Sequence, residues 1–249
     1  MARDHRPSRH RARVIAAAVT ALTVGGTVLF EAPASAVGKP RGHDVSSHQK
    51  NVDWPSARTK GAQFVYVKAT ESHTYRNPYF AQQYGGAREA GILHGAYHFA
   101  LPDRSSGTAQ ATHFVRNGGA WRADGRTLPP ALDIEYNPYG RNKCYGLTKA
   151  GMATWIKAFS DEVRRRTGRL PVIYTTTHWW NTCTGGSRAF GDHPLWVARY
   201  DSTTAGTLPA GWSFWTFWQY DNSGSLPGDQ NLFNGSMARL KELARGPRE

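Results

Sequence analysis

The stretch "TKAGMATWIKAFSDEVRRRTGRLPVIYTTT", residues 148–177, decides the fold. Its first part repeats apolar side chains at three- and four-residue steps between a threonine and a glycine, which predicts a helix over 148–167. Its second part, "PVIYTTT" (171–177), is a β-branched and aromatic run of the kind found in strands. A similar run, "ALDIEY" (131–136), precedes the helix. Strand, helix and strand in this order predict a βαβ unit with parallel strands and a right-handed crossover.

The same alternation extends over most of the chain. Further strands are expected over 42–46, 64–70, 94–100, 194–200 and 213–221. Further helices are expected near 54–60, 78–90 and 106–117. Several of the strand candidates are apolar on both faces, as strands of a buried parallel sheet are. We therefore expect an α/β protein with a parallel sheet or a barrel, and the shrinking helices after about residue 195 make its last third irregular.

The N-terminal region has the organisation of a targeting segment. An arginine-rich start leads into an uncharged apolar run of 17 residues, and small residues Ala34 and Ala36 follow. This order is typical of a secretory signal peptide over 1–36, cleaved after Ala36. An uncleaved membrane anchor is the alternative. We expect a secreted, extracellular protein with a single catalytic domain over 37–249.

The chain is strongly basic. Its formal net charge is +13, and leaving out the five arginines and two acidic residues of 1–36 reduces this to +10. Such a charge favours polyanionic partners. The basic residues are scattered and match no nucleic-acid fold signature, so no nucleic acid is expected. No second apolar run follows, so no membrane contact is expected after removal of the signal. Anionic wall polymers fit an exported monomer best.

Two cysteines, Cys144 and Cys183, are present. In an exported chain they are expected to form a disulfide, because the compartment is oxidising. In the chain-entropy model this bond would contribute about 3–4 kcal/mol of stability.

Four acidic residues fall at expected strand ends, the edge where parallel α/β sheets and barrels collect reactive groups. They are Asp44, Asp133, Glu135 and Asp229. Asp133 and Glu135 are two residues apart, so they share one face of a strand and their Cα atoms lie roughly 6.6 Å apart. Ile134 then points toward the packing helices. Two like charges at this separation raise the proton affinity of one of them, which keeps a carboxylic acid protonated near neutral pH.

Other chemistry fits the sequence less well. One alternative is that the carboxylates only cap loops, and another is a cation site, because clustered carboxylates also suit Ca²⁺ or Mg²⁺. However, no loop has a regular spacing of oxygen ligands, so no metal and no cofactor are expected. The serines and histidine of "DVSSHQ" (44–49) lack the G-x-S-x-G elbow of a hydrolase nucleophile, and the histidines lack zinc spacing.

Aromatic side chains at or after the strand ends are candidates for stacking on sugar rings. They are Tyr97, Tyr136, Trp179 and Tyr220. His98, in "AYHFA", is a further candidate for a substrate contact. A place in the core is the alternative for each aromatic, because Trp and Tyr bury large areas. It is the preferred interpretation for Trp155, Trp196 and Trp215.

Seven motifs in order make the chain resemble a known enzyme family. They are "GHDVSSHQKNVDW", "KATES", "GAYHFA", "LDIEY", "LWVARYD", "WQY" and "GDQNLF", spread over about residues 41–235. Together they resemble the glycoside hydrolase family 25 lysozymes, the Chalaropsis-type N-acetylmuramidases. The resemblance implies an incomplete or irregular TIM-like β/α barrel. It also implies hydrolysis of the β-1,4 bond between N-acetylmuramic acid and N-acetylglucosamine in bacterial peptidoglycan.

By motif, the acidic site residues of that family fall on Asp44, Asp133, Glu135 and Asp229. The resemblance implies that Glu135 is the general acid and then activates water. One alternative is that Asp133 attacks the anomeric carbon. In the preferred interpretation, the 2-acetamido group of the substrate attacks, and Asp133 or Asp229 orients it. Asp44 would tune the pair. The lysine after glutamine in "QKNVDW", where the family often has glycine, affects only a turn.

Two alternatives stay open. The first is a chitinase-like glycosidase, although Ala131 and Leu132 stand where such enzymes carry further acidic residues. The second is a non-catalytic glycan-binding protein of the cell wall. The two differ from the lysozyme hypothesis in what they cleave: chitin in the first case and nothing in the second.

Overall fold

The structure is a computed structural model that describes residues 38–246. The expected signal peptide over 1–36 lies outside the described residues. Between Gly38 and Gly246, no helix is long and apolar enough to cross a membrane.

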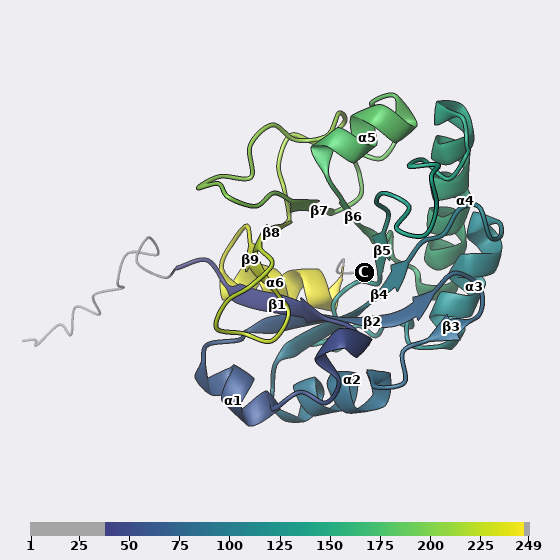
Figure 1. The fold of residues 1–249 in the computed structure, drawn as a ribbon. Helices are drawn as coiled ribbons and strands as arrows, with labels where there is room; N and C mark the ends of the chain where they lie inside the picture. The colour runs from purple at the N-terminus through teal and green to yellow at the C-terminus, as the bar shows by residue number, and fades with distance from the viewer. Residues whose placement is uncertain (1–37, 247–249) are drawn as a thin grey trace, which may run out of the picture. The chain divides into compact units, whose positions relative to one another are not determined.

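The described chain forms a closed barrel, which Figure 1 shows with its strands around a central axis. The strands are β1 (Arg41–Val45), β2 (Phe64–Glu71), β3 (Tyr75–Arg76), β4 (Leu93–Phe99), β5 (Ala131–Asp133), β6 (Val172–Thr175), β7 (Leu195–Ala198), β8 (Phe217–Asp221) and β9 (Asp229–Phe233). The barrel closes because β1 pairs with both β2 and β9. β3 stays outside the ring and forms a short hairpin with β2.

One strand of the barrel runs against all the others. β1, β2 and β4 to β8 are parallel neighbours, which confirms the expected irregular α/β barrel. β9 was not among the expected strands, and it runs antiparallel to both β8 and β1. The connection over 222–228 is too short for a crossover helix, so the chain must return in the opposite direction.

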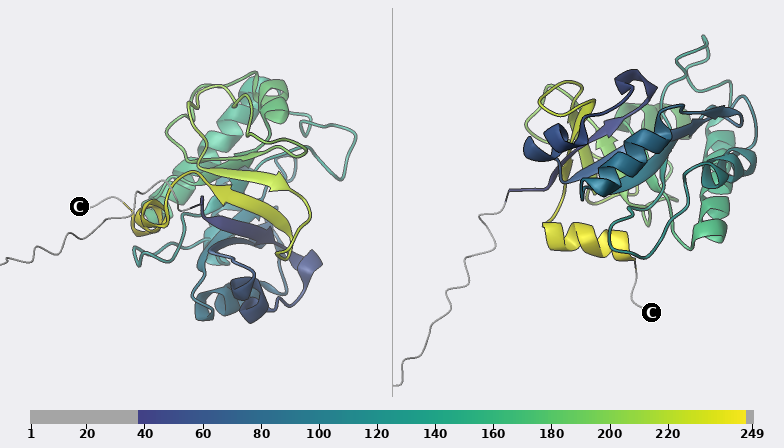
Figure 2. Two further views of the ribbon diagram at one scale, coloured as in Figure 1. Left: turned by 90° about the vertical axis from the view of Figure 1, so that its left-hand side faces the viewer. Right: turned by 90° about the horizontal axis from the view of Figure 1, so that it is seen from below.

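Helices cover the outside of the barrel. They are α1 (Trp54–Thr59), α2 (Phe80–Glu89), α3 (Gly107–Arg116), α4 (Lys149–Thr167), α5 (Thr177–Thr184) and α6 (Met237–Arg245), with a short 3₁₀ helix, η2 (Ser47–Gln49). The four expected helices are present with nearly the expected bounds. No helix lies between β7 and β9, as the sequence indicated for the last third, and Figure 2 shows α6 at one end of the barrel.

Four strands are shorter than expected. β5 covers only Ala131–Asp133 of the expected 131–136, so Ile134 and Glu135 follow the strand, and β7 covers only Leu195–Ala198 of the expected 194–200. The strand expected over 171–177 ends at Thr175, because the Thr176 side chain accepts a hydrogen bond from the Trp179 N–H and caps α5. The strand expected over 213–221 begins only at Phe217.

Aromatic side chains fill the interior of the barrel below its rim. The buried cluster includes Phe64, Tyr66, Tyr97, Tyr174, Trp196, Phe217 and Phe233. Two glycines make room for it: a Cβ at Gly95 would lie 2.4 Å from the Tyr66 ring, and one at Gly42 would lie 2.5 Å from the Phe64 carbonyl oxygen. The barrel is therefore a packed core with space for a ligand only at its ends.

A second apolar layer lies between the barrel and helices α3 to α5. Ile134 is fully buried there with Ile156 and Phe159 of α4. This confirms that Ile134 points away from the barrel axis, and so it fixes the opposite direction for Asp133 and Glu135.

The expected disulfide is present. It joins Cys144, in the loop after β5, to Cys183 of α5, with Cα atoms 5.4 Å apart. The bond thereby links the segments that follow two neighbouring strands.

Removing this bond should lower stability more than any single surface change. Replacing Cys144 and Cys183 together by serine is expected to lower the free energy of unfolding by about 3–4 kcal/mol, because the unfolded chain gains the freedom of an open loop. Urea denaturation under non-reducing conditions measures this. An unchanged midpoint for the double variant would contradict the prediction.

Candidate active site

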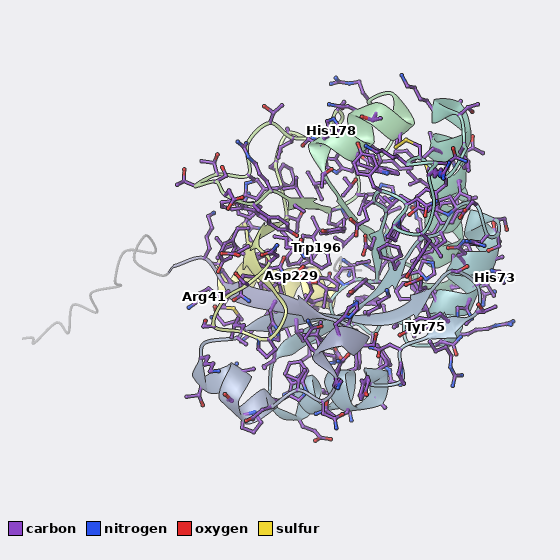
Figure 3. All side chains as sticks on the ribbon, in the orientation of Figure 1. Arg41, His73, Tyr75, His178, Trp196 and Asp229 are labelled. Atoms are coloured by element: carbon purple, nitrogen blue, oxygen red, sulfur yellow. A yellow bond between two sulfur atoms is a disulfide. The ribbon has the colours of Figure 1, made fainter. Side chains whose placement is uncertain are left out.

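A cavity of about 230 Å³ opens at the carboxyl ends of the parallel strands. Its lining residues are Asp44, Ser46, His48, Gln49, Lys68, Tyr97, Phe99, Asp133, Glu135, Tyr174, Trp196, Gln219 and Asp229. All four acidic residues expected from the sequence are among them. Figure 3 shows Trp196 and Asp229 near the centre of the barrel, whereas Tyr75 and His178 lie toward its outer edge.

Three strands bring the carboxylates together. Asp133 is the last residue of β5, and Glu135 follows it on the same side of the chain. Asp44 lies in β1 directly opposite Asp229, the first residue of β9. Because β9 is antiparallel, its first residue reaches the same rim as the last residues of its neighbours. The expectation that Asp229 ends a strand is thus corrected, while its place in the cavity agrees with the sequence.

Gly228 allows the close approach of β9 to β1. Its φ angle is +77°, and a Cβ there would lie 2.0 Å from the Asp44 carbonyl oxygen. Any side chain at this position must move the backbone that carries Asp44 and Asp229.

Two amides hold the carboxylate of Asp44. Gln219 Nε2 and Asn231 Nδ2 donate to its Oδ2 at 2.8 and 2.7 Å. The oxygen of each amide accepts a second hydrogen bond. Tyr174 donates its hydroxyl to Gln219 Oε1 at 2.8 Å, and Trp196 Nε1 donates to Asn231 Oδ1 at 2.7 Å. Since an indole N–H can only donate, the Asn231 amide must turn its NH₂ group toward Asp44.

The electrostatic environment favours protonated carboxyl groups. Burial, together with the charge of Asp229, raises the pKa of Asp44 to about 7. Burial also raises the pKa of Glu135 to about 7, against the opposing effect of the Lys68 cation. The pKa of Asp133 lies well above its usual range, because the group is buried and then because Glu135 is close. The pair Asp133 and Glu135 therefore retains a proton at neutral pH.

The Asp133 carboxylate is incompletely satisfied by the protein. Its Oδ1 atom is buried and has no hydrogen-bond partner among residues 38–246. A buried carboxylate oxygen without a donor is costly unless a ligand supplies one. In this same range, no three His, Cys, Asp or Glu side chains are grouped so as to hold a metal ion.

Lys68 is the cation that lines the cavity. Its Nζ lies 2.6 Å from Glu71 Oε2 and 4.6 Å from the centre of the Phe99 ring. Both side chains of the ion pair are mostly buried. The pair therefore forms a rigid part of the wall beside Asp133 and Glu135.

The expected substrate-binding residues are only partly brought together. Tyr97 lines the cavity. His98, the next residue of β4, faces the outer layer, where it is fully buried, contacts Thr70 and Gln110 through hydrogen bonds and stacks on Phe159. Adjacent residues of a strand point to opposite faces, so Tyr97 and His98 cannot share one cavity.

The other three aromatic candidates lie away from the cavity lining. Trp179 is fully buried in the core beneath α5. Tyr136 is half-buried just beyond Glu135 and hydrogen-bonds His178 Nδ1 at 2.7 Å. Tyr220 packs against Trp218 on the outer side of β8, with ring centres 5.8 Å apart. Trp179 is structural, whereas Tyr136 stays a candidate for contact with an extended ligand.

The sequence interpretation missed the residues that hold Asp44. Gln219 lies two residues after Phe217, and Asn231 two residues before Phe233. Both phenylalanines belong to the barrel interior. Applying the two-residue period of a strand to these segments would have placed Gln219 and Asn231 on the inner face. Trp196, expected in the core, is buried and also lines the cavity.

Comparison with known proteins agrees with this architecture. The model of the family described as glycosyl hydrolases family 25 matches residues 43–229. Lysozyme M1 of Streptomyces globisporus is 49% identical over 210 residues, which are 82% of this chain and 71% of that protein. The N,O-diacetylmuramidase of a Chalaropsis species is 45% identical over 211 residues, 83% of this chain and 99% of that protein.

Solved structures give the same result. A family 25 lysozyme from Aspergillus fumigatus superimposes with a TM-score of 0.82 at 49% identity, covering 84% of this chain and all of that one. The lysozyme of Streptomyces coelicolor gives a TM-score of 0.81 at 48% identity, covering 84% of this chain and 98% of that one. A shared barrel and a match over most of both chains leave one conclusion. The chain belongs to glycosyl hydrolases family 25.

Proposed function

We propose that this enzyme is a secreted lysozyme that hydrolyses the β-1,4 bond between N-acetylmuramic acid and N-acetylglucosamine in bacterial peptidoglycan. The observation that carries the proposal is the convergence of Asp44, Asp133, Glu135 and Asp229 on one cavity. Relatives named lysozyme and N,O-diacetylmuramidase, at 45–49% identity, support the choice of substrate.

Glu135 acts as the general acid. It protonates the departing glycosidic oxygen and then, as a carboxylate, activates the water that completes hydrolysis with retention. A pKa of about 7 suits both steps, because the group gains and loses its proton near neutral pH. Lys68, beside it, keeps this pKa from rising further.

Asp133 orients the 2-acetamido group of the substrate, which attacks the anomeric carbon in place of a protein nucleophile. The unpartnered Oδ1 of Asp133 supports this role, because an acetamide N–H would supply the missing donor. Asp229 assists from β9, and Asp44, held by Gln219 and Asn231, sets the charge of the site.

The remaining features concern where the enzyme works. Residues 1–36 act as a cleaved signal peptide, and 37–249 form a single catalytic domain that acts as a monomer outside the cell. The positive charge attracts the enzyme to anionic wall polymers, an effect that salt weakens.

Mass spectrometry of reduced digestion products tests the proposal. Purified peptidoglycan and chitin are digested side by side, and the new reducing ends are labelled by borohydride. Reduced muramic acid from peptidoglycan, with chitin left intact, is the expected result. Reduced N-acetylglucosamine at the new ends, or no product, would overturn the proposal.

A further inference from the structure

Arginine side chains gather at the end of the barrel opposite the carboxylates. They come from the last turn of α2, the loop over 118–130, the turn after α4 and the last residue of α6, and they are Arg88, Arg122, Arg126, Arg169 and Arg245. A Cβ at Gly125 would lie 3.8 Å from Arg245 Nη2, and the Arg169 guanidinium lies 4.5 Å from the ring centre of Trp121. The loop therefore brings charges from distant parts of the sequence together.

Four of these arginines are free to bind an external anion, whereas Arg169 is half-buried and donates to the Leu243 carbonyl oxygen at 3.1 Å. None of the ion pairs found within residues 38–246 includes any of the five side chains. Arg88, Arg122, Arg126 and Arg245 are exposed. Unpaired guanidinium groups side by side repel one another, and a bound anion relieves the repulsion.

A cavity of about 220 Å³ lies within this cluster. Arg88 and Arg122 line it, together with Tyr84, His94 and Thr127. His94 is almost fully buried at the start of β4 and packs edge-on against Tyr84 with ring centres 4.6 Å apart. The two guanidinium groups are the groups of this cavity that can donate charge-assisted hydrogen bonds to an oxyanion, with the Tyr84 phenol beside them. The Thr127 hydroxyl is already bonded to Asp124, and His94 Nδ1 to the Ile92 carbonyl oxygen.

One acidic side chain, Asp124, also lines the cavity, and its carboxylate is already engaged. It accepts hydrogen bonds from the N–H groups of Arg126 and Thr127 at 2.8 and 2.7 Å and from the Thr127 hydroxyl at 2.9 Å. These contacts fold the loop that presents Arg122 and Arg126. The negative charge of Asp124 therefore offsets only one of the five positive charges of the arginine cluster.

We propose that this arginine cluster binds the phosphodiester groups of an anionic wall polymer of the poly(glycerol phosphate) kind. The inference rests on the proposed function, because a wall glycan as substrate puts such a polymer within reach. Arginine forks match the two free oxygens of a phosphodiester. A slender, single-stranded polymer also lets one phosphate enter the cavity between Arg88 and Arg122, while its neighbours contact the outer arginines.

The arginine cluster and the carboxylate cavity lie at opposite ends of the barrel, so a polymer bound to the cluster does not block the cavity. His94 lies near one end of β4, and Phe99, which lines the carboxylate cavity, is the last residue of the same strand. A polymer bound near the His94 end of β4 leaves the Phe99 end, where the carboxylate cavity lies, open to the glycan. The enzyme is retained on the wall without competition between the polymer and the substrate.

Two variants of equal charge test the proposal. In one, Arg88→Gln and Arg122→Gln remove the arginines of the cavity. In the matched control, Lys149→Gln and Arg188→Gln remove two exposed charges, one at the start of α4 and one shortly after α5. Neither side chain takes part in an ion pair within residues 38–246. Binding of purified poly(glycerol phosphate) is measured at about 50 mM and 200 mM salt, since phosphate contacts weaken with salt.

We expect the cavity variant to bind the polymer at least about 10-fold more weakly and with a shallower salt dependence, because two charge-assisted contacts are lost. The control should change by less than about 2-fold. Equal losses of polymer affinity in both variants would show a general effect of net charge and would contradict a binding site at Arg88 and Arg122. Tighter binding to duplex DNA or to phosphatidylglycerol vesicles than to the polymer would contradict the choice of poly(glycerol phosphate) as the partner.

Two further measurements separate this inference from folding and from the proposed function. In the unaltered protein, millimolar inorganic phosphate should shift the NMR signals of the His94 ring and leave those of His178 in place. No shift at His94 would count against the site even if the variants failed to fold. The unaltered protein and the two variants should digest polymer-free peptidoglycan equally well. A variant that loses polymer binding but keeps full digestion therefore tests the arginine cluster without testing the proposed lysozyme activity.

Discussion

Replacing Glu135 by glutamine is expected to lower kcat for peptidoglycan by about 10³-fold, in the range of 10²–10⁴ that general acid and base catalysis contributes. Glutamine keeps the shape of the side chain but cannot donate the proton or accept it again. Binding of the glycan should stay within a few-fold of the unaltered enzyme, which isothermal titration with a non-hydrolysed fragment measures. The matched control is Glu89→Gln, on the outside of α2, which should leave both quantities unchanged.

Stability gives this variant a second readout. Burial raises the pKa of Glu135 to about 7, so ionising it in the folded protein costs free energy that increases as the pH rises above the unfolded-state value of about 4.5. Glutamine removes this cost. Glu135→Gln should therefore be at least as heat-stable as the unaltered enzyme at pH 8, and a lower melting temperature there would attribute the lost activity to damage of the fold.

The pH dependence of the unaltered enzyme follows from the same group. As the proposed general acid, Glu135 carries its proton when the substrate binds, so kcat/KM should fall as the pH rises through about 7. An activity that stays constant up to pH 9 would contradict the assignment of Glu135 as the acid.

Much of the fold follows from local patterns. The helix over 149–167 needs only its apolar period and its capping residues Thr148 and Gly168, both of which the structure confirms. The inward side of β5 follows from Ile134, because an apolar residue between two acids must face the other layer. Such features depend on neighbours in sequence, and the sequence therefore suffices to predict them.

The direction of β9 depends on a different kind of information. "DQNLF" has only five residues and carries three polar ones, so nothing in its composition indicates a strand at the heart of a barrel. It is held there by pairing with β1, nearly 190 residues away in sequence, and by Gly228, whose close approach to Asp44 is visible only in three dimensions. The positions of Asp44 and Asp229 in the chain were thus enough to predict that they converge. The antiparallel direction of β9, which brings Asp229 to the rim, could not be predicted.

The aromatic residues show the limit of the same approach. Tyr97 and His98 are neighbours on one strand, so at most one of them can face the ligand, a rule that the sequence already contains. Trp179 is different, because the sequence does not reveal that a helix begins at Thr177 and turns this side chain into the core. Predictions for isolated aromatic residues therefore need the packing of the helices as well as the strand period.

Replacing Asp133 by asparagine is the second change with a large expected effect. We expect kcat to fall by about 10²–10³-fold, because the variant loses the negative charge that steadies the positive charge of the reacting acetamido group. The pKa of Asp133 lies well above its usual range because the group is buried and also because Glu135 is close, so the two acids titrate as a pair. Glu135 titrates alone in the variant, and the decline of kcat/KM at high pH should therefore change its position. A change in kcat without any shift of the pH profile would contradict the coupling of the two groups.

The remaining question, whether Asp133 is itself the nucleophile, is answered by azide. The substrate is an aryl glycoside, whose leaving group departs without a proton from the enzyme. Glu135→Ala serves as the positive control: azide should restore its turnover and form a β-glycosyl azide, because the intermediate still forms and azide attacks it in place of activated water. For Asp133→Ala, an acetamido nucleophile predicts no glycosyl azide of inverted configuration. If Asp133 were the nucleophile, azide would occupy the space of the lost carboxylate and yield an α-glycosyl azide, and that product would overturn substrate assistance while leaving Glu135 as the acid.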